Sequence, residues 1–258
     1  MKVVILCGGL GTRLREQTTF IPKPMVPIGD KPILWHIMKI FYHQGFNEFV
    51  LPLGYKGELI KEFFVHYKSA SSDFTLDIDK ENNIEFHNNR KCEAWKIHFI
   101  ETGLLTKTAK RISLLKKVLD DEDGFIVTYG DGVADINLKE LIAFHKKKGL
   151  LATVTGFKPY HRFGFIDEKN GIVKQFREKP RMQSMVNIGF MIFRKEALDY
   201  FTEEDTMLEL DVLPRIAKDG KLSVYEHNGS WYYMDTLRDW EELNQIWEQN
   251  PVWKIWKD

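Results

Sequence analysis

Short apolar runs alternate with amphipathic segments along the first part of the chain. Residues 3–7 and 49–54 are almost continuously apolar, which is typical of strands buried on both faces. Between them, residues 32–44 repeat apolar side chains at helical spacing, begin at a proline and are followed by a glycine. Residues 57–67 predict a second helix. This strand–helix–strand–helix order predicts a parallel sheet joined by right-handed crossovers.

The polar stretch at residues 68–95 interrupts this pattern. Its segments 74–79 and 83–87 alternate apolar and polar residues on either side of Asn82 and Asn83. Asparagine pairs favour turns, and period-two alternation favours half-exposed strands. We therefore expect a protruding β-hairpin inserted into the sheet domain here.

Later segments return to the alternation of strands and helices. Further elements are expected at 96–103, 108–119, 124–132 and 138–149, followed by four strands between 151 and 193, a strand-forming stretch at 222–236 and a helical tail at 237–258. We find no repeat, linker or low-complexity tract in the sequence. The expected organisation is one α/β domain, 1–258, with a mostly parallel central sheet flanked by helices.

Composition excludes several classes of protein. The 37 basic and 37 acidic residues balance, so no general nucleic-acid surface is expected. The two cysteines form no CxxC pair or His/Cys cluster, which argues against a disulfide framework or a structural zinc site and favours a reducing compartment. No apolar run approaches the ~18 residues of a membrane span, and the apolar start is shorter than a signal peptide. We expect a soluble, cytoplasmic protein.

A glycine-rich loop, GGLGTRL at residues 8–14, follows the first strand. Glycine lets backbone N–H groups approach phosphate oxygens without a Cβ in the way, although such a loop alone is also a tight turn. It lacks the third glycine of the dinucleotide fingerprint and the Gly-Lys-Ser/Thr of a P-loop. Lys23, whose position is restricted by Pro22 and Pro24, joins Arg13 beside this loop. Together they favour a phosphate-binding site.

These motifs resemble the signature of the sugar-1-phosphate nucleotidylyltransferases, which make nucleoside diphosphate sugars. The matching segments are 8–14, KPMVPI at 23–28 and KPI at 31–33. The resemblance implies a Rossmann-like nucleotide-diphospho-sugar transferase fold in which the glycines wrap a nucleoside triphosphate. It implies catalytic roles for Arg13 at the β and γ phosphates and for Lys23 near the reacting phosphates. The implied nucleotide-binding residues are Leu6, Gly8, Gly9, Gly11, Thr12, Arg13, Lys23, Thr108 and Arg111.

Further segments extend the resemblance to a metal and a sugar phosphate. Asp131, in YGDG, and Asp235, in WYYMDT, match the two family aspartates that hold Mg²⁺, a cation that prefers oxygen ligands. They are about a hundred residues apart and meet only if the fold brings them together. In EKP at 178–180, the resemblance assigns Glu178 to the sugar hydroxyls and Lys179 to the sugar phosphate. It also places Asn187 and Gly189 beside the sugar.

One branch of the family fits along nearly the whole chain. Segments 95–103, 129–135, 234–239 and 251–256 resemble the branch that joins CTP to glucose 1-phosphate. The implied reaction transfers a cytidylyl group to a sugar 1-phosphate and releases pyrophosphate, with Mg²⁺ as cofactor. Enzymes of this branch form homo-oligomers and serve deoxysugar synthesis for bacterial surface polysaccharide, including O-antigen.

Three departures from the family pattern involve four positions. Ala109 and Lys110 replace a glycine pair, Glu101 replaces an aspartate, and Ile188 replaces a glycine near the sugar. If the side chain of Ile188 points into the pocket, we expect an accepted sugar other than glucose. If it points into the core, we expect no change in the accepted sugar.

Three alternative functions stay open beside this reading. The first is the same chemistry with a different phosphorylated acceptor or another nucleotide. The second is a non-catalytic module that binds sugar nucleotides; such modules tend to lose the phosphate lysine or metal aspartate that this chain keeps. The third is an NAD-type dehydrogenase domain, against which the missing third glycine and the KPMVPI context both argue.

Overall fold

The computed structural model describes residues 1–9, 11–79, 83–87, 92–161 and 163–256. An eight-stranded sheet forms its centre, and its strands β7, β4, β1 and β8 run parallel to one another. The strands lie in the order β13-β10-β14-β8-β1-β4-β7, with β15 paired to β10. The strands are β1 (Val3–Leu6), β4 (Glu48–Leu53), β7 (Lys96–Glu101), β8 (Gly124–Tyr129), β10 (Ala152–Phe157), β13 (Val186–Asn187), β14 (Met191–Arg194) and β15 (Leu222–His227). The mostly parallel sheet expected from the sequence is confirmed.

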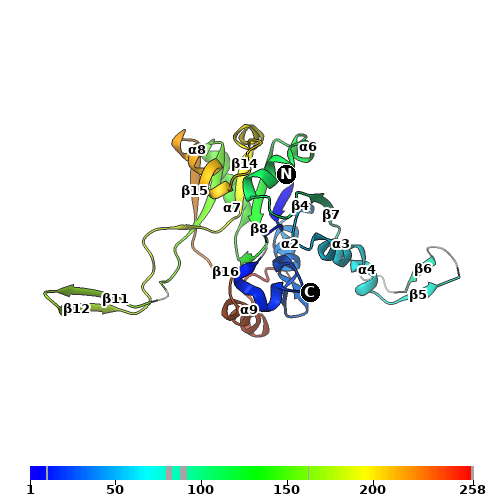
Figure 1. The fold of residues 1–258 in the computed structure, drawn as a ribbon, viewed down its shortest axis with the longest axis horizontal. Helices are drawn as coiled ribbons and strands as arrows, with labels where there is room; N and C mark the ends of the chain where they lie inside the picture. The colour runs from blue at the N-terminus through cyan, green and yellow to red at the C-terminus, as the bar shows by residue number, and fades with distance from the viewer. Residues whose placement is uncertain (10, 80–82, 88–91, 162, 257–258) are drawn as a thin grey trace.

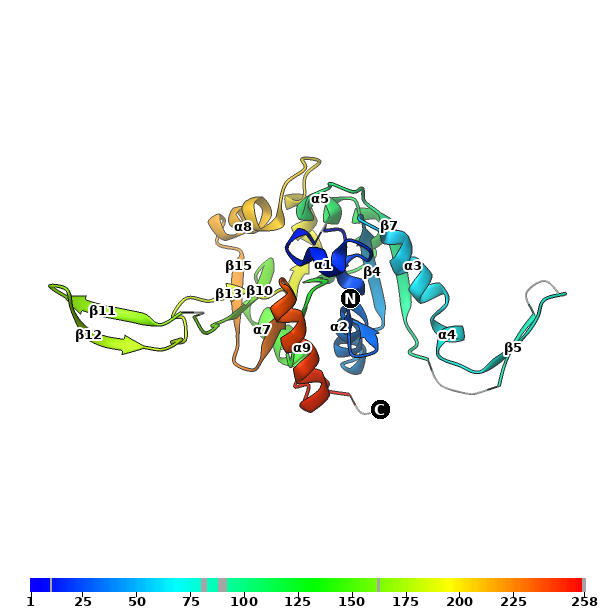
Figure 2. The ribbon, with the colours of Figure 1, turned by 60° about the horizontal axis from the view of Figure 1, so that its bottom comes forward.

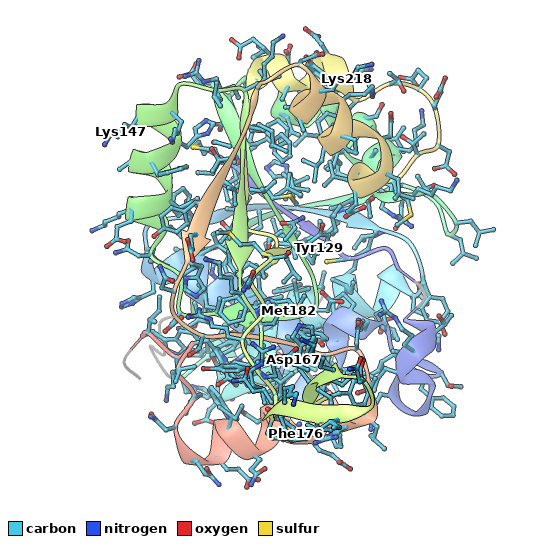
Figure 3. The ribbon with its side chains drawn as sticks, turned by 90° about the vertical axis from the view of Figure 1, so that its left-hand side faces the viewer. Tyr129, Lys147, Asp167, Phe176, Met182 and Lys218 are labelled. Carbon is cyan, nitrogen blue, oxygen red and sulfur yellow. The ribbon has the colours of Figure 1, made fainter. Side chains whose placement is uncertain are left out.

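Helices cover both faces of the sheet, so each face has its own hydrophobic core. In β1, Val3 and Ile5 face one core and Val4 and Leu6 the other, which explains why this strand is continuously apolar. Figure 3 shows α7 and α8 on opposite sides of the strands. The first core contains α2 (Ile33–His43), α3 (Gly57–Val65), α7 (Leu138–Lys148) and α9 (Leu237–Gln249); the second contains α5 (Thr108–Ser113), α6 (Lys116–Leu119) and α8 (Leu213–Lys218).

Shorter elements connect the main ones. They are η1 (Thr12–Leu14), α1 (Arg15–Thr18), η2 (Lys23–Met25), β2 (Pro27–Ile28), β3 (Lys31–Pro32), α4 (Tyr67–Ala70), β9 (Gly132–Ala134), η3 (Lys195–Tyr200), η4 (Leu208–Val212) and β16 (Trp231–Tyr233). Two of them, β9 and β16, form a small antiparallel ladder that is separate from the main sheet. Within the described residues, no helix combines the length and apolar character needed to cross a membrane.

Two β-hairpins extend from opposite sides of the body (Figures 1 and 2). The first, β5 (Phe74–Asp77) with β6 (Asn83–Phe86), is the hairpin expected from the sequence, although Asn82 of its expected turn lies outside the described residues. The second, β11 (Phe165–Lys169) with β12 (Ile172–Arg177), is exposed along its whole length. The sequence did not predict this second arm, because its alternation is the same as that of a half-buried strand.

Helix α9 and the segment after it pack onto the loop that follows Lys23. Trp240 Nε1 donates a hydrogen bond to the carbonyl of Pro27 at 2.8 Å, and the backbone N–H of Gly29 donates to Asn244 Oδ1 at 2.9 Å. Trp253 is completely buried against the body. Helix α9 and the tryptophans of the segment after it, Trp253 and Trp256, therefore belong to the core, and α9 fixes the position of the Lys23 loop.

His36 on α2 lies fully buried beneath this contact. Its Nε2 is 3.0 Å from the carbonyl of Ile28, and Trp253 Nε1 donates to its Nδ1 at 3.5 Å. These partners require a neutral ring with the proton on Nε2. Burial lowers the pKa of His36 to about 4, since water does not reach the ring to solvate a positive charge.

The pKa of His36 predicts a pH-dependent loss of stability. Below its ordinary value of 6.5 the unfolded chain takes up a proton that folded His36 refuses until about pH 4. We expect the free energy of unfolding to fall by about 3 kcal/mol from this residue as the pH drops through that range. Urea unfolding followed by circular dichroism between pH 7 and pH 4.5 measures it.

His36→Gln is the matched control, because its amide keeps a donor toward Ile28 but does not titrate. The variant should be less stable at pH 7 and lose less stability on acidification than the parent. Identical pH slopes for the two proteins would contradict the assignment.

Candidate functional site

The carboxyl ends of β1, β4, β7 and β8 meet at one edge of the sheet, where open α/β folds bind ligands. A cavity of about 390 Å³ opens there. It is lined by every residue that the sequence predicted to bind the nucleotide: Leu6, Gly8, Gly9, Gly11, Thr12, Arg13, Lys23, Thr108 and Arg111. The fold therefore gathers these residues around one space, and we call it the first cavity.

Arg111 forms a buried part of the cavity wall. Its Nη1 donates to the carbonyl of Leu53 at 2.9 Å and to Thr102 Oγ1 at 2.5 Å, and its Nη2 donates to the carbonyl of Gly8 at 2.8 Å. Burial lowers the pKa of Arg111. These partners are uncharged, so the positive charge is balanced by no contacting carboxylate of the described residues. Arg111 thus fastens the glycine loop to the ends of β4 and β7, a role that the sequence did not suggest.

Lys23 brings the two predicted metal aspartates together. Its Nζ lies 2.6 Å from Asp131 Oδ2 and 2.5 Å from Asp235 Oδ1. Arg13 Nη1 contacts the other oxygen of Asp235 at 2.6 Å. Burial opposes the charge of Lys23, but Asp131 and Asp235 outweigh it and raise the pKa of the ammonium above its ordinary value. Lys23 is therefore a firmly charged cation held between two carboxylates.

The β9–β16 ladder explains how residues so far apart in sequence meet. Asp131 directly precedes β9, and Tyr233 of β16 pairs with Gly132. The N–H of Met234 then donates to the carbonyl of Asp131 at 2.9 Å, which places Asp235 beside it. A capping box at Thr236 starts α9 immediately afterwards. The position of Asp235 is thus fixed by a strand on one side and a helix on the other.

The chemistry of this pair fits a divalent cation that arrives with a phosphate. Asp131 and Asp235 already converge on one cation, the ammonium of Lys23. Among the described residues, no group of three or more His, Cys, Asp or Glu side chains could hold a metal alone. Mg²⁺ commonly binds through one or two carboxylates and completes its shell with substrate phosphates and water. The donor set therefore suits such a cation.

A second cavity of about 710 Å³ adjoins the first. Both are lined by Arg13, Tyr129, Asp131 and Glu209, and the second also by Asp235 and by Asn187. Figure 3 shows Tyr129 at the end of its strand and Met182, another lining residue, on the neighbouring segment. The charged cluster around Lys23 thus lies where the two cavities meet.

The residues predicted to contact the sugar are not all brought to this cavity. Asn187 lines it, whereas Gly189 does not. Gly189 has φ +82°, and a Cβ there would lie 2.8 Å from Thr128 Oγ1, so the backbone itself demands glycine. Glu178 and Lys179 are exposed, follow the β11–β12 arm and line neither cavity. Their contact with a sugar stays a prediction.

The three departures from the family pattern lie outside both cavities. Ile188 is 2% exposed and packs in the first core, so it does not narrow the pocket. Lys110 pairs with Glu203, and Glu101 pairs with Lys61. These positions therefore give no reason to expect an altered acceptor.

Sequence reasoning missed two residues shared by the cavities, Tyr129 and Glu209. The Tyr129 hydroxyl donates to Glu209 Oε1 at 2.6 Å and accepts from Asn187 Nδ2 at 3.1 Å. Thr108 Oγ1 donates to Glu209 Oε2 at 3.1 Å. Burial, together with Glu209, raises the pKa of Tyr129. Glu209 belongs to no recognisable motif, and the π-helical turn that carries it, η4, has no clear sequence signal.

Residues 2–250 match the family model described as nucleotidyl transferase, and the chain belongs to this family. It is 47% identical over 258 residues to the probable glucose-1-phosphate cytidylyltransferase of Bacillus subtilis, covering 99% of this chain and 100% of the relative. It is 43% identical to glucose-1-phosphate cytidylyltransferase of Salmonella typhimurium, with 100% of each chain covered. These similarities confirm the family inferred from the motifs.

Solved structures agree with the fold. HddC from Yersinia pseudotuberculosis matches with a TM-score of 0.69 at 25% identity, covering 95% of this chain and 99% of that chain. UDP-glucose pyrophosphorylase complexed with UDP-glucose matches with a TM-score of 0.68 at 17% identity, covering 96% and 98%. The Rossmann-like α/β architecture is therefore confirmed, and a dehydrogenase domain is set aside.

Gly8 and Gly9 offer a matched test of the Arg111 contact. A Cβ on Gly8 would lie 2.0 Å from Arg111 Cζ, whereas a Cβ on Gly9 would meet nothing within 4 Å. Gly8→Ala should displace the buried guanidinium from its carbonyls and lower the free energy of unfolding by about 2–3 kcal/mol. Gly9→Ala should change it by less than about 0.5 kcal/mol. Urea unfolding of both variants decides, and equal effects would show that Arg111 does not depend on Gly8.

Proposed function

We propose that this protein transfers the cytidylyl group of CTP to α-D-glucose 1-phosphate, giving CDP-glucose and pyrophosphate. The observation that carries the proposal is the cluster of Lys23, Asp131 and Asp235 at the junction of two cavities. Support for the particular substrates comes from the relatives of that name, which are 43% and 47% identical over essentially both whole chains. The departures at Ile188 and Lys110, which lie outside the cavities, are consistent with the same acceptor.

The chemistry requires two polyanions to meet. An oxygen of the sugar phosphate attacks the α-phosphorus of CTP, and pyrophosphate leaves. Because the acceptor is already an anion, no strong general base is needed. Lys23 would neutralise charge on the transferring phosphoryl group and the leaving pyrophosphate, and Arg13, at the rim, would hold the pyrophosphate. Catalysis is then positioning and electrostatic stabilisation.

We propose Mg²⁺ as the cofactor, held by Asp131 and Asp235, where it supplies positive charge to the phosphates of the nucleotide. Lys23 now contacts both carboxylates. Each carboxylate uses one of its two oxygens for Lys23, so Asp131 and Asp235 would hold the cation beside an ammonium that can also contact a phosphate.

On the acceptor side, Asn187 is the predicted sugar residue that lines the second cavity. We propose that Glu178 and Lys179 join it when the base of the β11–β12 arm moves toward the cavity. Their exposure and the absence of a packed core along the arm support such movement.

We propose that the chain is a single cytoplasmic domain that forms homo-oligomers. Both arms expose apolar residues, including Ile78 at 88% and Phe176 at 60%, and a protein partner would cover them. A second copy is the partner that the family resemblance suggests. In this setting CDP-glucose would serve the deoxysugars of bacterial surface polysaccharide.

The first experiment measures pyrophosphate release with Mg²⁺ across CTP, UTP, dTTP, ATP and GTP against glucose 1-phosphate and other sugar 1-phosphates. Release with CTP and glucose 1-phosphate in clear preference to other pairs is expected. Release with another pair would keep the chemistry and change the substrates. If folded protein binds CTP but releases no pyrophosphate with any pair of substrates, the protein is a non-catalytic module.

Lys23→Ala tests the central role. The variant should fold normally and lose at least about a hundredfold in kcat, or about 2.7 kcal/mol of transition-state stabilisation. Lys147→Ala on the exposed end of α7 is the control and should keep full activity. If Lys23→Ala retains more than about a tenth of the activity, the lysine does not act on the reacting phosphates.

A further inference from the structure

Glu209 stands at the boundary of the two cavities. It belongs to η4, a π-helical turn, and π-helical turns in proteins are frequent at functional sites. Its side chain contributes to the wall of both cavities, as do Tyr129, Arg13 and Asp131. Of these four, Arg13 and Asp131 are explained by the cluster around Lys23. Glu209 and its partner Tyr129 have no role in the mechanism described so far.

A directed chain of hydrogen bonds ends on the Glu209 carboxylate. On one side, Asn187 Nδ2 donates to the Tyr129 hydroxyl, which donates to Glu209 Oε1 at 2.6 Å. On the other side, the N–H of Leu208 donates to Thr108 Oγ1 at 2.8 Å, and this hydroxyl donates to Glu209 Oε2. Each donor therefore points toward the carboxylate. The side chain is held in place, and each oxygen keeps a further lone pair for a ligand.

The charge of Glu209 differs from that of the other acidic groups in the second cavity. Asp131 contacts Lys23, and Asp235 contacts both Lys23 and Arg13. The partners of Glu209 among the described residues are neutral hydroxyls, so its negative charge is not cancelled by a contacting cation. The second cavity consequently has paired charges around Arg13 and Asp235 and, at Glu209, a carboxylate with no contacting cation among the described residues.

We propose that Glu209 is a specificity-determining residue that makes the second cavity select neutral sugar phosphates. Its carboxylate accepts hydrogen bonds from sugar hydroxyls and repels acceptors that carry a second acidic group, such as uronic acid 1-phosphates. The proposal rests on the proposed function in one respect, that the acceptor occupies the second cavity. Like charges at contact distance in a partly enclosed site lower affinity by roughly tenfold or more.

Glu209→Gln tests the charge with almost no change in shape. We would measure kcat/KM with CTP for glucose 1-phosphate and for glucuronic acid 1-phosphate in the parent and the variant. The parent should prefer the neutral acceptor, and the preference should shrink by at least about tenfold in Glu209→Gln. The amide still accepts a hydrogen bond but carries no charge. The kcat/KM for glucuronic acid 1-phosphate should therefore rise in the variant.

Tyr129→Phe is the matched control. It removes a hydroxyl that donates to Glu209 but leaves the carboxylate charged. Its preference for the neutral acceptor should stay within about threefold of the parent's. If Tyr129→Phe relaxes the preference as much as Glu209→Gln does, the hydrogen-bond network and not the charge sets specificity, and the proposal is wrong.

A second measurement keeps the proposal testable if Glu209→Gln does not fold. Calorimetry on the parent, with an unreactive CTP analogue bound, gives the affinity for both acceptors as salt is raised. The preference for the neutral acceptor should narrow with salt, because screening weakens repulsion between charges while the shared phosphate cancels in the ratio. Equal affinities at low salt would overturn the proposal and leave the cytidylyl transfer intact. Loss of the proposed function would instead appear as no turnover of glucose 1-phosphate with CTP by the parent.

Discussion

The structure of the site depends on one ammonium group held between two carboxylates. Lys23 is 108 positions from Asp131 and 212 positions from Asp235, so three remote parts of the chain meet at a single cation. Each part is fixed independently: the lysine by its prolines and by α9, one aspartate by the end of β8, the other by β16 and a helix cap. The ammonium of Lys23 neutralises the two like charges that the fold brings together here. That balance is what makes the place suitable for phosphates and for a cation.

The elements and site residues that follow from local sequence patterns could be predicted from the sequence. The apolar run at 3–7 and the helical spacing at 32–44 correspond to β1 and α2, and the glycine loop lines the first cavity as expected. Local patterns could not show that Asp131 and Asp235 both reach Lys23, since their positions follow from strand pairing between β9 and β16. They also could not distinguish the exposed β11–β12 arm from a half-buried strand, nor reveal Glu209, whose importance comes only from its neighbours.

Positive and negative side chains line the walls of the two cavities. The first combines Arg13, Lys23 and the buried guanidinium of Arg111, whose contacts among the described residues are all neutral, so that positive potential is left for an anion. Glu209, which accepts a hydrogen bond from the Tyr129 hydroxyl, lines both cavities and places an anion at their boundary. In the proposed function, the cationic side chains attract both phosphates to the junction of the cavities. The carboxylate of Glu209 then orients the neutral sugar of the acceptor. Binding and orientation thus use different residues on one continuous surface.

The contact between α9 and the Lys23 loop also bears on how the protein is made. The hydrogen bond from Trp240 to Pro27 joins positions 213 residues apart. During synthesis the glycine loop, Lys23 and most of the sheet leave the ribosome long before their partner does, and domains that depend on such distant contacts complete their folding late. The nascent chain therefore carries an open, unfinished site through most of its translation. Asp235 and the α9 contact with the Lys23 loop are added only when the last part of the chain has been made.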